Sequence, residues 1–107
     1  MYNNIKAICV YAWKGRIAMV IKTDAFAGTQ ESSDIVVTVM PGTDGIQIHL
    51  KSVVERYYGD SIRATIRSVL EELGVENANV EAVDHGALDC TIRARVTTAV
   101  RRASGEV

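Results

Sequence analysis

Alternating apolar and polar residues predict two strands in the first half of the chain. In residues 34–40, DIVVTVM, β-branched residues occupy both faces of an extended segment. Residues 46–50, IQIHL, alternate more regularly and place Gln47 and His49 on the outer face. The segment PGTDG between them is rich in turn formers. We therefore expect these two strands to pair as an antiparallel hairpin.

A weaker extended segment precedes these strands at residues 20–30. We expect it to pair with residues 34–40 through a turn at 31–33. This turn places Ser32 and Ser33 between two acids at a hairpin tip. On physical grounds alone the serines are ordinary turn residues, whose hydroxyls bond to nearby backbone groups.

Helical periodicity follows residue 52. Ser52 and Glu55 have the spacing of a capping box, which predicts a helix that begins at Val53. We expect one helix, bent or broken at most near Gly59, that ends at Gly74 in the left-handed conformation. Its apolar stripe comprises Val54, Tyr58, Ile62, Ile66, Val69, Leu70 and Leu73.

The last third of the chain predicts a strand and a second helix. The strand covers residues 79–84 and is closed by turn formers at 84–86. Arg101 and Arg102 fall in the last helical turn, where the helix dipole favours cations, and Gly105 ends the helix. The apolar stripe of this helix comprises Leu88, Ile92, Val96, Ala99, Val100 and Ala103. Together the elements predict an α+β fold, a small antiparallel sheet of three to four strands with two helices packed on one face.

Composition indicates a single globular domain. The chain has 107 residues, of which 48% are hydrophobic, and one proline.

No apolar stretch approaches the roughly 20 residues of a membrane span, and the N-terminus lacks a signal peptide, so we expect a cytoplasmic protein without a membrane contact. The net charge of −1 has no basic block, and Tyr57 and Tyr58 lack a basic stripe beside them. We therefore expect no nucleic-acid partner.

The first 18 residues differ from the rest in charge. They contain three bases and no acid, whereas all thirteen acids lie from Asp24 onward. Lys14, Gly15 and Arg16 can be encoded as AAA GGG AGG, which contains a ribosome-binding sequence shortly before Met19. We therefore expect residues 1–18 to be a non-native or flexible extension and residues 19–107 to form the domain. A genuine additional strand at residues 1–18 is the alternative.

Few residues are candidates for catalysis. Cys9 and Cys90, with His49 and His85, lack the spacing of a metal site, so we expect no metal. Asp89 precedes Cys90, but adjacent helical residues do not face each other, which favours an inert thiol over a nucleophile. The histidines are expected to be solvated. Phosphate-binding glycine loops and a nucleophile elbow are missing from the sequence, so no self-contained enzyme is indicated.

Five segments, in order, resemble a known family. They are AGTQESSDIVVTVMP, VVERYYGDSIRATI, VLEELGV, DHGALDCTIRARV and RRASG. Together they are similar to the acyl carrier (gamma) subunit of citrate lyase over residues 19–105. The resemblance implies a non-catalytic carrier whose serine in AGTxES holds 2′-(5″-phosphoribosyl)-3′-dephospho-CoA through a phosphodiester. By position this is Ser32; Ser33 makes the choice ambiguous by chemistry alone. Glu31 and Asp34 are then expected to keep the tip hydrated.

The resemblance also implies partners. A prosthetic-group transferase would attach the arm and a ligase would acetylate its thiol. The alpha subunit would exchange acetyl for citrate, and the beta subunit would cleave the citryl thioester, so that citrate fermentation yields acetate and oxaloacetate. The helix with Arg93 and Arg95 is the expected docking surface. Alternatives are the carriers of citramalate lyase or malonate decarboxylase, a small ligand-binding α+β domain, and an enzyme that uses Cys90.

Overall fold

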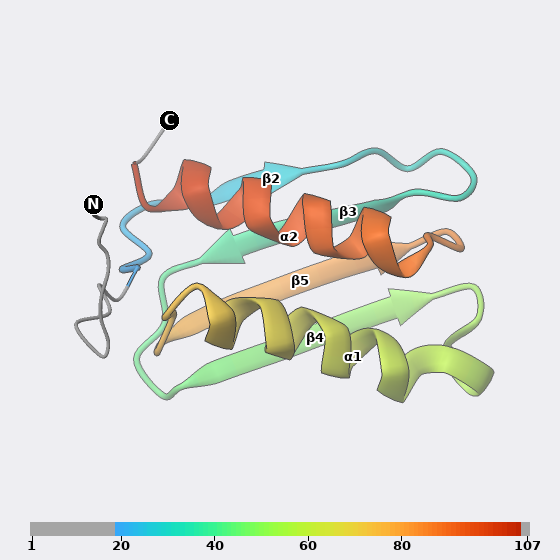
Figure 1. The fold of residues 1–107 in the computed structure, drawn as a ribbon, viewed down its shortest axis with the longest axis horizontal. Helices are drawn as coiled ribbons and strands as arrows, with labels where there is room; N and C mark the ends of the chain where they lie inside the picture. Colours follow the sequence, from blue (N-terminus) through green and yellow to red (C-terminus); the bar gives the residue numbers. More distant parts are fainter. Residues whose placement is uncertain (1–18, 106–107) are drawn as a thin grey trace.

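The computed structural model describes residues 19–105, so the extension expected at residues 1–18 lies outside the described residues. Both helices cover the same face of one four-stranded sheet (Figure 1). This confirms the predicted α+β fold with two helices on one face. The strands are β2 (Ala25–Ala27), β3 (Ile35–Met40), β4 (Ile46–Ser52) and β5 (Ala78–Asp84), and the helices are α1 (Glu55–Glu72) and α2 (Asp89–Ala103). Neither helix has the length and apolarity that crossing a membrane would require.

The strand order corrects the sequence prediction. The order is β2-β3-β5-β4, so β5 lies between the two strands that we expected to form a hairpin. β5 runs antiparallel to β3, with Ile35 opposite Asp84, and parallel to β4, with Ile46 opposite Ala78. The sheet is therefore mixed. The connection at residues 41–45 is long enough to pass one intervening strand, a separation of about 10 Å, and α1 carries the chain back so that β5 can run parallel to β4.

The other predicted elements form, with two changes: the extended segment expected at residues 20–30 is a strand only at 25–27, and one helix begins later than expected. β2 pairs antiparallel with β3, and α1 is continuous from Glu55 to Glu72, with Gly74 at φ +77° after its end. The predicted capping box is wrong, because the helix begins two residues later and its N-cap, Val54, makes no side-chain hydrogen bond. The Ser52 hydroxyl instead accepts the Val54 N–H at 3.0 Å. The Glu55 side chain lies outside the described part of the structure.

The core lies between the inner face of the sheet and the two helices. Alternate residues of β3 and β5 point into it, and both predicted helical stripes supply most of the opposite wall. Tyr58 and Leu88 depart from this pattern, because they remain 59% and 69% exposed. Both lie at the end of the molecule where α1 and α2 begin. The loops from β2 to β3 and from β5 to α2 reach that same end (Figure 1).

Candidate functional site

Ser32 lies in an exposed β-turn between β2 and β3. The turn is closed by the Asp34 N–H, which donates to the Glu31 carbonyl at 3.2 Å. Ser32 takes its second position, and Ser33 takes its third position at φ +65°. A positive φ at the third position is required by type II turns and is uncommon for serine. Ser32 is exposed, and its hydroxyl has no hydrogen-bond partner among residues 19–105, so an external reagent can reach it.

The Asp34 carboxylate anchors the serine turn to neighbouring elements through hydrogen bonds. Asp34 is 9% exposed, so the expectation that it hydrates the tip is wrong, whereas Glu31 is exposed as expected. Arg95 donates to both carboxylate oxygens, at 3.1 and 2.9 Å, and Thr29 Oγ1 and the Ile35 N–H each donate at 2.7 Å. These hydrogen bonds, with that of Arg95 the most important, hold the pKa of Asp34 well below its ordinary value. A charged network therefore joins the loop, β3 and α2.

The loop after β5 holds the turn from the side. The Ser33 N–H donates to the His85 carbonyl at 2.8 Å, and the His85 N–H donates to the Asp34 carbonyl at 2.9 Å. These bonds extend the pairing of β3 and β5 into the serine turn. The expectation of a solvated His85 is wrong, since the residue is half-buried and its Nε2 is buried without a partner among the described residues.

Gly28 allows the loop to pass close to β3. Its φ is +106°, and a Cβ built there would lie 1.8 Å from the carbonyl oxygen of Ile35. Only glycine fits such an approach, because any side chain would overlap the strand backbone. The glycine of the AGT segment therefore determines the path of the chain into the serine turn.

Asp84 organises the neighbouring loop. It is 1% exposed, and its carboxylate accepts hydrogen bonds from the Ser52 hydroxyl at 2.8 Å and from the N–H groups of Gly86 and Ala87 at 3.1 and 2.9 Å. The sequence pattern predicts Asp84 only as a turn former. The signal for this wider role was an aspartate two residues before a glycine, which is typical of side chains that bond to the backbone of their own turn.

The remaining candidate residues lie on the helices. Arg93 pairs with Glu72 at 2.9 Å, and Arg95 pairs with Asp34, so both guanidinium groups of the expected docking surface are engaged within the chain. Docking by this helix stays a prediction. Cys90 is exposed on the first turn of α2, and Cys9 lies outside the described residues.

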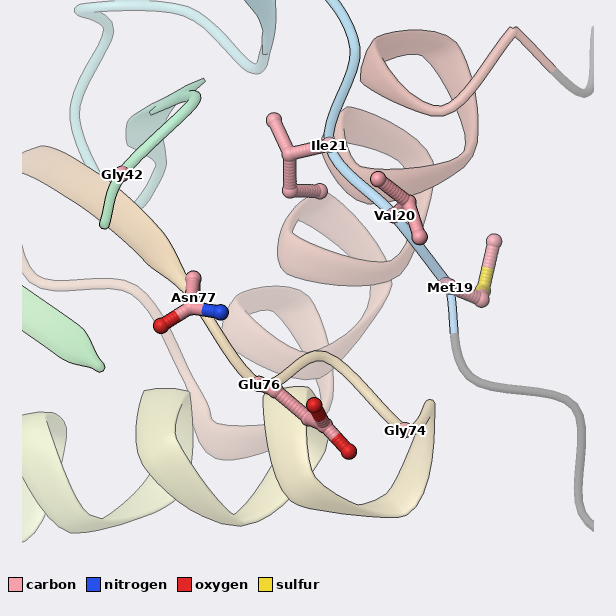
Figure 2. A pocket seen from close by; sticks show the side chains of 7 residues that line it. All are labelled: Met19, Val20, Ile21, Gly42, Gly74, Glu76 and Asn77. Atoms are coloured by element: carbon pink, nitrogen blue, oxygen red, sulfur yellow. The ribbon is translucent and has the colours of Figure 1, made fainter. Parts of the chain in front are cut away.

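Besides a wider hollow of about 660 Å³ that is lined by residues of β4, β5 and α1, two hollows lie at opposite ends of the described part of the molecule. One, of about 390 Å³, separates the first turns of the helices and is walled by Val54, Tyr58, Ile62, Ala87, Leu88 and Ile92. We call it the helix-tip groove. The other is smaller, about 130 Å³, and is lined in part by Met19, Gly42 and Asn77 (Figure 2). Of these two, the helix-tip groove lies where the helices begin. The loop between β2 and β3, which carries the serine turn, reaches the same end of the molecule (Figure 1).

Comparison with known proteins tests the family resemblance. The citrate lyase acyl carrier protein of Lacticaseibacillus casei is 55% identical over 86 residues, which cover 80% of this chain and 85% of that protein. That of Streptococcus mutans serotype c is 56% identical over 87 residues, with the same two shares. The chain belongs to the citrate lyase acyl carrier protein family. The resemblance seen in the sequence segments is confirmed.

Two further findings agree with membership of this acyl carrier family. A family model described as "Malonate decarboxylase delta subunit (MdcD)" matches residues 22–103. A chain in the crystal structure of a Pseudomonas malonate decarboxylase hetero-tetramer in complex with malonate has a TM-score of 0.69, with 82% of this chain and 91% of that chain covered. At 17% sequence identity, this likeness shows that the two chains share a fold.

Proposed function

We propose that this chain is the acyl carrier subunit of citrate lyase and that Ser32 holds 2′-(5″-phosphoribosyl)-3′-dephospho-CoA through a phosphodiester. In this proposal it is a non-catalytic subunit of a cytoplasmic complex with alpha and beta subunits, loaded by a transferase and acetylated by a ligase. The observation that carries the proposal is the exposed, unpaired Ser32 hydroxyl in a turn that is fixed from two sides.

The surroundings of Ser32 fit a bulky anionic group. A transferase needs a hydroxyl that it can reach, and a protruding turn provides one that the middle of a strand would not. Modification of the Ser32 hydroxyl leaves the supporting hydrogen bonds of the turn intact. Ser33 is exposed as well, and its bond to His85 uses the backbone amide rather than the hydroxyl. The choice of Ser32 over Ser33 therefore rests on its place directly after Glu31 in the AGTxES motif.

The protein provides a fixed attachment point for the arm. When attached, the group supplies a terminal thiol on which acyl groups travel as thioesters. Asp34, held by Arg95, fixes the attachment point relative to the helices. Because the arm is tethered to a fixed point, each encounter of the acyl group with a partner active site is effectively intramolecular. This raises the local concentration of the acyl group.

Malonate decarboxylase is the second candidate for the parent complex. The family model and the shared fold support it. The identity of about half to two citrate lyase carriers, against 17% to the decarboxylase chain, favours citrate lyase. Citramalate lyase stays an alternative, since the substrate would be recognised by other subunits. Reconstitution with the alpha and beta subunits of each complex would distinguish them.

Intact mass and peptide mapping test the attachment. The chain isolated from cells that ferment citrate should carry one adduct with the mass of the phosphoribosyl dephospho-CoA group on the peptide that contains Ser32. Ser32→Ala should abolish the adduct, and the matched control Ser33→Ala should retain it. An unmodified wild-type chain would contradict the carrier role. Loss of the adduct in Ser33→Ala alone would move the attachment to the neighbouring serine.

A further inference from the structure

Exposed apolar side chains gather around the helix-tip groove. Among residues 19–105 six large hydrophobic side chains are exposed, and four of them lie where the helices begin: Val53, Tyr57, Tyr58 and Leu88. Tyr58 and Leu88 form part of the groove wall. Exposed apolar side chains at the wall of a groove are typical of a binding site.

The groove lies next to the serine turn. Ser33 is bonded to His85, and the next residue, Gly86, lines the groove. Steps of about 3.8 Å between successive Cα atoms and about 5 Å across the strand pair place the groove mouth on the order of 10 Å from Ser32. Asp84 fixes this intervening loop through the amides of Gly86 and Ala87. A flexible arm on Ser32 is therefore long enough to reach the groove and enter it.

We propose that the helix-tip groove receives the pantetheine portion of the arm on Ser32, an inference that rests on the proposed function above. Pantetheine is uncharged, with a dimethyl-substituted carbon and short alkyl segments that suit the apolar walls. Its two amides and its hydroxyl suit Ser61 and Asp89, which line the same groove. The volume of about 390 Å³ lies in the range of small-molecule sites.

Covalent attachment favours the arm over a free ligand as the occupant of the groove. A covalently attached ligand is present at an effective concentration on the order of millimolar, so even weak binding would fill the groove for much of the time. The Asp89 carboxylate also disfavours an anionic occupant, which leaves the phosphates outside the groove. The groove thus shelters the arm between transfers, and an arm that carries a strongly anionic acyl group is released from it.

Disulfide trapping measures where the arm resides. In a chain with Cys9 and Cys90 changed to serine, Ser61→Cys places a thiol in the groove. The control, Lys51→Cys, places one at the same end on the outer face of β4, where Lys51 is exposed. Lys51 lines the wider hollow of about 660 Å³, so the comparison tests whether the arm prefers the helix-tip groove to another concave surface. Both variants are loaded by the transferase and equilibrated with oxidised and reduced glutathione. The arm thiol and the cysteine form a disulfide as one oxidised glutathione is reduced to two thiols.

The expected result is an effective concentration about tenfold or more higher for Ser61→Cys than for Lys51→Cys. Equal values in two fully loaded variants would overturn arm docking. Intact mass before oxidation reports loading separately, so a missing adduct contradicts the proposed function and leaves the two failures distinguishable.

Spectra of the unaltered chain give an independent readout. Amide NMR signals of the loaded and unloaded wild-type protein should differ most at Tyr58, Ile62 and Ile92, beyond any change at His49 on the outer sheet face. Changes confined to residues 30–34 would overturn the proposal. Groove changes that appear only when an alpha or beta subunit is added would assign the groove to that partner and overturn it as well.

Discussion

A methyl group at Gly28 tests how closely the loop before the serine turn must approach β3. In Gly28→Ala the new Cβ would lie 1.8 Å from the carbonyl oxygen of Ile35 and 2.9 Å from its carbon. Real Cβ atoms essentially never show contacts under 3.0 Å, so the loop and the strand must separate by more than 1 Å. The strand cannot yield easily, because β3 is paired on both sides.

The expected loss of stability has two parts. Overpacking against a rigid neighbour costs about 1–3 kcal/mol. Placing a non-glycine residue at positive φ costs about 1–2 kcal/mol more. A total of about 2–5 kcal/mol is a large share of the roughly 5–15 kcal/mol that stabilises a domain. It corresponds to a fall in Tm of roughly 10–30 °C for a chain of this size.

Gly86→Ala is the matched control. Gly86 has a similar φ, +92°, but a Cβ there meets nothing within 4 Å, so only the backbone cost applies. Urea denaturation followed by circular dichroism should show Gly28→Ala to be less stable than Gly86→Ala by at least about 1 kcal/mol. If the two variants lose equal stability, the reasoning from the contact with Ile35 is wrong.

Three further predictions concern charged and reactive residues. Because the pKa of Asp34 in the folded protein lies below its ordinary value of 3.8, its charge stabilises the fold above that pH, and this stabilisation is lost as the pH falls toward the lower folded pKa. Asp34→Asn should therefore lower stability to urea at pH 7, and the difference from wild type should shrink below pH 3.8; a constant difference would contradict the role of the charge. Arg93→Ala should lower the free energy of unfolding by no more than about 1 kcal/mol, because its pairing with Glu72 is solvent-exposed; a larger loss in the same assay would show that the pair is structural. Cys90→Ala should leave transferase loading, followed by intact mass, unchanged, and a loss of loading would indicate that the exposed thiol takes part.

Local patterns in the sequence predicted the elements well, because the information that forms them is local. The helical stripes and the alternation in β3 follow from the burial of one face, and the serine turn follows from its polar residues. Burial of Ile66 and Val96, for example, needs no knowledge of the partner strand. These positions were predictable from spacing alone.

The neighbours of each strand were harder to predict, because alternation says which face is buried and nothing about which strand lies alongside. β3 and β4 have a turn-rich connection, which favoured a hairpin. The contrary signal was the succession of strand, long helix and strand from β4 to β5, which is typical of a parallel pair joined by a crossover. Similarly, Asp34 and Arg95 are 61 residues apart, and no local pattern links them.

The long-range support of the serine turn has a consequence for biosynthesis. Ser32 is translated early, but the groups that hold its turn in place, the His85 carbonyl and the Arg95 guanidinium, are made near the end of the chain. A nascent or truncated polypeptide exposes the serine without its scaffold. A transferase that reads the shape of this turn would modify only completed, correctly folded molecules. Loading would then discriminate against incomplete or misfolded chains, so the prosthetic group would not be attached to molecules that are later degraded.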